Sequence, residues 1–219
     1  MIDCTARVEA GAPIDPHLVD GAVVCLAAGV HHASLLIDAS LTLRGEPGAV
    51  LDAGRAGPVV RVAADQLVVK LEGLTLRGGA GDAGGGIRLT GWSELVVSQC
   101  VVEDNEALLA GGGIGGGAFA ERGKLTLNDT QFRGNRARGG SDLLASGLAA
   151  IEVNGGSFAG DVTLLDGVRA TLSGGRVHGK LTTRGTTTRA PAVTLKGMAV
   201  DGGIDNDANL PATLVVEDG

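Results

Sequence analysis

The sequence predicts an all-β protein folded as a right-handed parallel β-helix of about eight coils, with three short parallel sheets. Three observations indicate this fold class. An eleven-residue pattern recurs along the chain, apolar and polar residues alternate within it, and glycine far outnumbers the aromatic residues, with 38 glycines against three phenylalanines, one tryptophan and no tyrosine. A recurring unit that cannot cover its own apolar face must stack on its neighbours, as the units of a solenoid do.

The composition opposes the other common fold classes. Glycine inside a helix costs about 1 kcal/mol relative to alanine, so this much glycine disfavours helices and suits a chain that turns constantly. The glycines show no strict three-residue period, which excludes collagen. With so few aromatic residues, the core must be built from Val, Leu, Ile and Ala, which fits the thin layers of a solenoid.

Six segments of the chain align without gaps over eleven residues, and two shorter copies flank them. The six begin at Val69, Leu95, Leu125, Ile151, Ala170 and Val193, and the shorter copies begin at Leu41 and Leu214. The first, third and eighth positions are apolar in all six segments, while the second and fourth are mostly polar. Alternation with a period of two predicts a strand with one buried face. We therefore expect Leu71, Val97 and Leu127, at the third position, to lie above one another in the core.

The apolar positions change parity after the fourth residue of the repeat, which predicts a bend followed by a second strand. Glycine often occupies the fifth position, as at Gly73 and Gly155, and glycine is favoured in tight turns. A third short apolar segment lies between repeats, at 60–62, 87–89 and 162–164. Three strands per coil, with coils about 4.8 Å apart, then build a rod.

Residues 1–40 are predicted to form an N-terminal cap and first coil, and residues 41–219 the coils of one continuous domain. A short helical candidate at 15–19 would belong to the cap. An uncovered end of a β-helix exposes unpaired strand edges. We therefore expect self-association through the β-helix ends, a partner protein at such an end, or a longer native chain of which this sequence is a fragment.

Charge and hydropathy exclude two classes of partner. With 18 Lys and Arg against 25 Asp and Glu, the net charge of −7 argues against nucleic acid as the main partner. No run of eighteen apolar residues is present, so no membrane-spanning segment is predicted. The N-terminus lacks the basic and apolar segments of a signal peptide, which predicts a cytoplasmic protein if that terminus is the native one.

The cysteines and histidines predict no metal or cofactor site. Cys100 falls at an apolar repeat position and is predicted to be a small core residue. Cys4 and Cys25 could pair in an exported protein, and the sequence leaves that question open. His31 and His32 would point to opposite sides of one strand, so they could not chelate one metal ion together.

Two short motifs carry a resemblance to a known family. The turn after the second strand holds the segments 132–135 (FRGN) and 102–105 (VEDN), and glycine triplets followed by isoleucine occur at 84–87 and 111–114. These motifs resemble the FxxN and GGxI repeats of chlamydial polymorphic outer-membrane proteins and of related bacterial β-helix proteins with pectate-lyase-like architecture. The resemblance implies a secreted or surface-exposed rod, often adhesive. The chain departs from the pattern at Asp161, which stands where the asparagine is expected.

The asparagines of this motif are predicted to be structural. Asn105 and Asn135 tolerate left-handed backbone conformations and can bond their own backbone at a turn. Neither is expected to bind a ligand.

One row of charged residues is the only candidate for catalysis. Arg77, Glu103 and Arg133 share the ninth position of adjacent repeats, and their alternating sign predicts a surface ion-pair row worth less than about 1 kcal/mol per pair. The alternative interpretation is an active groove. Glycosidases use two facing carboxylates, which this row lacks, and only Trp92 and Phe119 remain as aromatic residues to expose to a sugar.

Three hypotheses of function follow. The first is a non-enzymatic β-helical module for binding or structure, part of a surface or secreted protein, with a protein or glycan partner that the sequence does not identify. The second is a polysaccharide lyase or hydrolase acting on acidic glycans. The third is an intracellular recognition or assembly module, which a Cys4–Cys25 disulfide would contradict.

Overall fold

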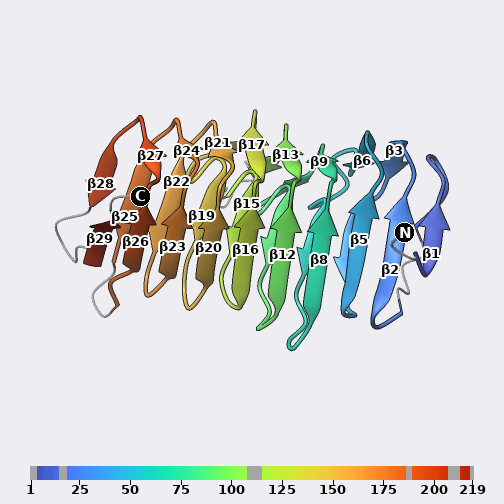
Figure 1. Ribbon diagram of the computed structural model, residues 1–219, viewed down its shortest axis with the longest axis horizontal. Helices are drawn as coiled ribbons and strands as arrows, with labels where there is room; N and C mark the ends of the chain where they lie inside the picture. The colour runs from blue at the N-terminus through green and yellow to red at the C-terminus, as the bar shows by residue number, and fades with distance from the viewer. Residues whose placement is uncertain (1–3, 15–18, 108–114, 186–188, 207–212, 218–219) are drawn as a thin grey trace.

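The computed structural model describes residues 4–14, 19–107, 115–185, 189–206 and 213–217. That part of the chain forms β-strands and no helix. Each strand pairs in parallel with the corresponding strand of the next coil. Figure 1 shows the coils stacked along one axis, from the blue N-terminal end to the red C-terminal end. The predicted parallel β-helix is confirmed.

Three long sheets run the length of the rod, which we name A, B and C. Sheet A has ten strands: β1 (Ala6–Val8), β2 (Ala22–Leu26), β5 (Leu41–Gly45), β8 (Val68–Glu72), β12 (Glu94–Ser98), β16 (Lys124–Asn128), β20 (Ala150–Asn154), β23 (Arg169–Ser173), β26 (Ala192–Lys196) and β29 (Thr213–Glu217). Sheet B has eight strands: β3 (Gly29–His32), β6 (Ala49–Asp52), β9 (Thr75–Arg77), β13 (Val101–Glu103), β17 (Gln131–Arg133), β21 (Ser157–Phe158), β24 (Arg176–Val177) and β27 (Ala199–Val200).

Sheet C also has eight strands, and a fourth sheet, D, is much shorter. Sheet C consists of β4 (Leu35–Ile37), β7 (Val60–Val62), β11 (Ile87–Leu89), β15 (Ala118–Ala120), β19 (Leu143–Ala145), β22 (Val162–Leu165), β25 (Leu181–Arg184) and β28 (Ile204–Asn206). Sheet D consists of β10 (Ala80–Gly81), β14 (Glu106–Ala107) and β18 (Arg136–Ala137). The three third-strand segments expected from the sequence are β7, β11 and β22. Sheet D is an addition to the three sheets that were predicted.

Eight coils carry a strand in each of sheets A, B and C, and β1 and β29 extend sheet A at the two ends. The number agrees with the predicted eight, although the coils are not the eight copies found in the sequence. Strands β2, β3 and β4 already form a complete coil within residues 1–40. The helical candidate at 15–19 lies, apart from its last residue, outside the described residues.

The register of sheet A reproduces the repeat alignment. Val97 pairs with both Leu71 and Leu127 in neighbouring strands, and all three side chains are at most 1% exposed. The eighth position behaves in the same way, because Val102 lies between Leu76 and Phe132 in sheet B. The rings of Phe132 and Phe158 stack with centroids 4.9 Å apart. Like residues therefore lie over like residues, and they form one continuous apolar core.

The bend between sheets A and B depends on a left-handed backbone at the fifth repeat position. The residues at this position all have positive φ: Gly73, Gln99, Asp129, Gly155, Gly174 and Gly197. Glycine adopts this conformation without the steric cost that a Cβ imposes. The repeated glycine of the sequence thus marks a turn, as predicted.

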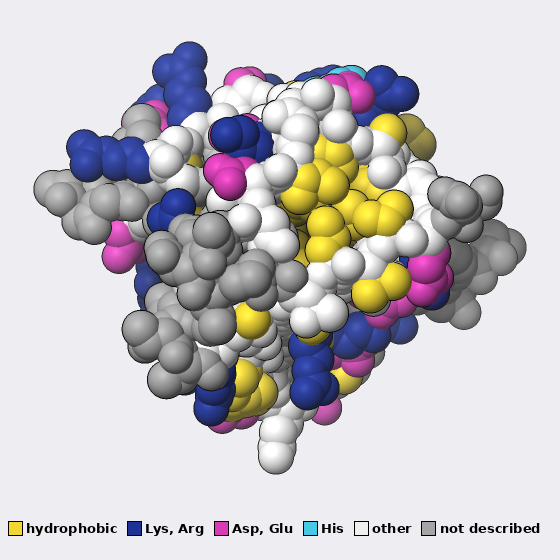
Figure 2. All heavy atoms as spheres, turned by 90° about the vertical axis from the view of Figure 1, so that its left-hand side faces the viewer, with side chains coloured by type: hydrophobic (Ala, Val, Ile, Leu, Met, Phe, Trp, Pro, Cys, Tyr) yellow, Lys and Arg dark blue, Asp and Glu magenta, His cyan; other side chains and the backbone are white. Residues whose placement is uncertain are grey.

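The two ends of the rod differ. At the N-terminal end, the disulfide Cys4–Cys25 joins the segment before β1 to β2, and Ile14 packs on the core. At the C-terminal end, Figure 2 shows apolar side chains gathered at the centre of the face. Val216 and Ile204 occupy inward-facing positions of the last strands, yet they are 65% and 42% exposed. Among the described residues, Ile14 thus packs over the core at the N-terminal end, whereas inward-facing side chains are exposed at the C-terminal end.

None of the described residues forms a helix with the length and apolar character that crossing a lipid bilayer requires.

Candidate functional site

The charged row predicted from the sequence exists, and its members are engaged with one another. Glu103 pairs in register with Arg77 on one side and Arg133 on the other. An Arg133 Nη2 atom lies 2.6 Å from Glu103 Oε2, whereas Arg77 Nε lies 2.9 Å from Asp52 Oδ2. Asp52 in turn pairs in register with His32. The row is thus longer than predicted, and each acidic side chain in it lies beside basic side chains.

Asp52 shows how this row acts on a titratable group. Partial burial raises the pKa of Asp52, but hydrogen bonds from the Gly54 N–H and from Arg77, together with the charge of Arg77, outweigh burial. The net effect holds the pKa of Asp52 below its ordinary value, so this carboxylate is ionised and bound to its neighbours. Such a group stabilises the row and is poorly placed to donate a proton.

The two motif asparagines build a ladder inside the rod rather than a turn on its surface. Asn105 is fully buried; its Oδ1 accepts from the Gly79 N–H at 2.8 Å and its Nδ2 donates to the Leu76 carbonyl at 3.0 Å. Asn135 Oδ1 accepts from both the Asn105 side chain and the Asn105 N–H, each at 3.1 Å. The prediction that each asparagine bonds its own turn is wrong, because each amide bridges to the coil before it.

The left-handed conformation expected of these asparagines lies one residue earlier. Asp104 has φ +52 and Gly134 has φ +65. This turn directs the asparagine side chain inward, where it forms hydrogen bonds with backbone groups of the preceding coil. A structural role remains our prediction for Asn105 and Asn135, but their hydrogen bonds join coils instead of closing a turn.

Asp142 completes the asparagine ladder and explains the departure at Asp161. The Asp142 carboxylate accepts from Asn135 Nδ2 at 2.9 Å and from the Gly160 N–H at 2.5 Å. The side chain of Asp142, the residue directly before β19, thus occupies the place where a further asparagine would extend the ladder. Burial raises the pKa of Asp142 despite these hydrogen bonds. The role of this group is therefore structural.

The counterpart of the glycine triplet 84–86 in the next coil begins later in the sequence than predicted. Ile87 pairs with Ala118, and Gly86 N–H donates to the Gly116 carbonyl, so the counterpart of 84–87 is 115–118. The predicted triplet 111–114 lies outside the described residues. Gly117 allows close approach to Asn135, because a Cβ on Gly117 would lie 3.0 Å from its Nδ2.

A shallow groove on the outer face of sheet A is the main surface feature that sequence reasoning missed. We name it the sheet A groove; it consists of two adjoining hollows of about 510 and 670 Å³ that share Ala150, Arg169 and Ala192. Other residues that line it are Trp92, Lys124, Leu148, Glu152, Gly167, Thr171, Arg189 and Thr194.

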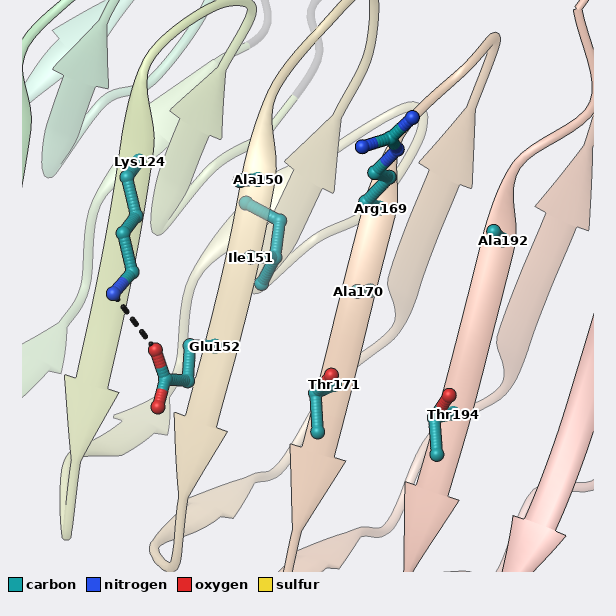
Figure 3. A pocket seen from close by; sticks show the side chains of 9 residues that line it. All are labelled: Lys124, Ala150, Ile151, Glu152, Arg169, Ala170, Thr171, Ala192 and Thr194. Carbon is teal, nitrogen blue, oxygen red and sulfur yellow. Dashed lines mark ion pairs between the residues drawn. The ribbon is translucent and has the colours of Figure 1, made fainter.

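Small neighbours of one arginine create the first hollow. Arg169 pairs in register with Ala150 on one side and Ala192 on the other, so it stands between two methyl groups. Figure 3 shows its side chain apart from the ion pair of Lys124 and Glu152, whose Nζ and Oε2 atoms lie 2.9 Å apart. Among the described residues, no acid forms an ion pair with Arg169.

A row of polar side chains crosses the floor of the same hollow. Glu152, Thr171 and Thr194 pair in register across β20, β23 and β26, and Figure 3 shows them side by side. A hydrogen bond and the charge of Lys124 lower the pKa of Glu152. The floor thus offers an ionised carboxylate and two hydroxyl groups.

The second hollow lies at the edge of sheet A where each coil enters it. Trp92 and Leu148, 50% and 45% exposed, lie on its border with Arg189. Gly167, which has no side chain, lies between Leu148 and Arg189 in the stack of coils. The aliphatic part of Arg189 passes over it, since a Cβ on Gly167 would lie 3.3 Å from Arg189 Cδ. The described part of the chain provides no acid in an ion pair with Arg189.

Phe119, which the sequence predicted as a second exposed aromatic residue, is buried. It packs with Ala83 and Leu144 in a small cluster on the outer side of sheet C. The four aromatic residues of the chain are thus divided between three buried phenylalanines and the half-exposed Trp92.

The described residues contain no group of three His, Cys, Asp or Glu side chains that could hold a metal ion. Cys100 is buried in the core, as predicted, and burial raises the pKa of its thiol to about 11. A thiol that stays protonated is a poor nucleophile.

No family model, curated protein or solved structure matches the chain. The column before the first apolar position, which holds Glu94, Lys124, Ala150, Arg169 and Ala192, is the signal that could have found the groove. In this column Glu94 and Lys124 form an ion pair, whereas Arg169 lies between Ala150 and Ala192.

Proposed function

We propose that this protein is a non-enzymatic β-helical binding module, with the sheet A groove as its binding surface. The observation that carries the proposal is that Arg169, Arg189 and the half-exposed Trp92 line one hollow. Lys124 in the same groove is paired by contrast, because it lies between Glu94 and Glu152. Arginines that form no ion pair with the described residues, in one hollow with an exposed aromatic ring, are typical of interaction surfaces.

The charged row of sheet B favours binding over catalysis as well. A lyase or hydrolase needs an acid or base that can reach the substrate. Glu103 is held by Arg133 and Arg77 is held by Asp52. These pairs support the interpretation of the row as a stabilising ladder.

The Cys4–Cys25 disulfide supports a place outside the reducing cytosol, because such bonds persist in oxidising compartments. This weighs against the intracellular assembly module. The resemblance of the turn motifs to chlamydial and related bacterial surface proteins points the same way, and we include a secreted or surface location in the proposal.

Measuring retention and turnover together tests the proposed function. The protein is immobilised and exposed to linear polysaccharides and acidic proteins, and both bound mass and ligand chain length are followed. We expect retention without chain cleavage. Cleavage that is lost in Arg133→Ala would overturn the proposal and establish the lyase or hydrolase, and a complete lack of retention would overturn the binding module.

The apolar side chains that the described residues expose at the C-terminal end support a second proposal, self-association. Among the described residues, Ile14 packs on the core at the N-terminal end, so a second copy would meet the apolar C-terminal face with its own C-terminal face (Figure 2). Such a two-fold contact closes on itself and forms a dimer.

Light scattering tests this arrangement. We expect a dimer for the parent protein and a monomer for Val216→Lys, because Val216 is 65% exposed at an inward-facing position. Leu36→Lys, on the outer face of β4 and 58% exposed, is the matched control and should remain dimeric. A monomeric parent at high concentration would contradict the proposal.

A further inference from the structure

We propose that the sheet A groove binds a linear anionic polysaccharide that lies along the rod axis. This inference rests on the proposed binding function and specifies its ligand. Arg169 and Arg189 would bind carboxylate or sulfate groups, and Trp92 would stack against a sugar ring.

The preference for an anion follows from local charge. The chain as a whole has a net charge of −7, yet Arg169 and Arg189 share one groove and form no ion pair with the described residues. The guanidinium group presents a planar fork of donors that matches carboxylate and sulfate oxygens. An anionic ligand would supply the partners that the described residues do not.

The preference for a sugar follows from the other lining groups. Trp92 offers a broad apolar ring surface with one polar edge, which suits a sugar ring with its alternating C–H and hydroxyl groups. Thr171, Thr194 and Glu152 provide hydroxyl and carboxylate groups across the floor of the groove. Polar groups in this number, around a single aromatic platform, match a hydroxyl-rich ligand better than an apolar one.

The preference for a polymer along the axis follows from the sheet. Trp92 precedes β12 and Arg189 precedes β26, so four strand spacings separate them, roughly 19 Å at about 4.8 Å each. One spacing is similar to the length of one sugar unit, so successive units would meet equivalent positions of successive coils. An extended peptide fits less well, because the face of sheet A has its backbone hydrogen bonds occupied by neighbouring strands, whereas strand addition needs a free edge.

The fluorescence of Trp92 tests the inference directly, because it is the chain's one tryptophan. The folded protein is titrated with alginate, which carries carboxylates, with dextran sulfate, and with neutral dextran. We expect a saturable change of Trp92 emission with one or both anionic polymers and none with dextran. The two anionic arms distinguish carboxylate from sulfate recognition.

Variants separate specific binding from general attraction. Arg169→Gln and Arg189→Gln should each weaken binding about tenfold, the loss expected for one charge-assisted hydrogen bond. Arg61→Gln removes an exposed arginine from the outer face of sheet C and should leave affinity unchanged. Thermal unfolding of each variant confirms that the fold is retained.

The outcomes distinguish the two proposals. Equal binding of dextran and the anionic polymers, or equal weakening by Arg61→Gln, overturns the inference and leaves the binding module standing. The same holds if an acidic peptide binds the groove and none of the three polymers does. Cleavage of a bound anionic polymer would instead overturn the non-enzymatic function and retain the ligand class.

Discussion

Replacing Asn105 with alanine should be among the most damaging single substitutions of a polar residue in this protein. The side chain is fully buried. It links its coil to the preceding one through the Gly79 N–H and the Leu76 carbonyl, and to the following one through Asn135 Oδ1. Alanine can replace none of these hydrogen bonds. The perturbation therefore leaves polar backbone groups unsatisfied inside the rod.

The magnitude can be worked from these contacts. A buried N–H without an acceptor, here that of Gly79, costs about 1–3 kcal/mol, and the lost hydrogen bond to Leu76 adds about 1 kcal/mol. Asn135 Oδ1 still accepts from the Asn105 N–H at 3.1 Å, so that group contributes little to the loss. We expect Asn105→Ala to lower the free energy of unfolding by about 3 kcal/mol.

Asn154→Ala is the matched control. Asn154 is exposed on the outer face of sheet A, where its Nδ2 donates to Asn128 Oδ1 at 2.9 Å. The same chemical change there should cost no more than about 0.5 kcal/mol, because water replaces the lost partner. Both variants are compared with the parent by urea denaturation followed by circular dichroism, with the slope of the transition checked in each.

Two results would refute the reasoning. One is a loss below about 1 kcal/mol in Asn105→Ala, which would mean that the ladder amides are solvated or free to rearrange. The other is an equal loss in the two variants. That would show that the amide ladders inside and outside the rod stabilise it alike.

Three further predictions address other parts of the rod. Phe132→Ala removes a ring stacked on Phe158 in the core and should cost about 4 kcal/mol in urea denaturation; the half-exposed Trp92→Ala should cost far less, and similar losses would contradict the assigned core. Burial raises the pKa of Asp142, so the folded state holds this proton more tightly, and stability from the group is present at low pH and lost as pH rises through the folded pKa. The stability advantage of the parent over Asp142→Ala should therefore be larger near about pH 4 than near about pH 7, and the opposite trend in urea titrations would show that the carboxylate is stabilised as an anion. Alkylation of the unreduced, denatured protein should label Cys100 alone by mass spectrometry, since Cys4 and Cys25 are bonded; reduction should lower stability by about 3 kcal/mol for a loop of this length, and three labelled cysteines before reduction would exclude the disulfide.

Much of the fold was determined by the sequence alone. A period of two decides which face of a strand is buried, so the inward positions of Leu71, Val97 and Leu127 followed from pattern alone. The bend at the fifth position followed from a repeated glycine, because a positive φ is costly for residues with a Cβ. Stacking then followed because a single coil cannot cover its own apolar face.

Only the tertiary structure decided how side chains of different coils meet. Asn105 lies inside the rod because the turn residue before it, Asp104, is left-handed, and Asp142 reaches the same ladder from the turn before β19. Phe119 is buried because Leu144 of the next coil and Ala83 cover it. The sheet A groove exists because Arg169 stands between Ala150 and Ala192 while Gly167 leaves space at its edge. Periodicity specifies the direction of each side chain, but its partners depend on how turns of unequal length bring the coils into register.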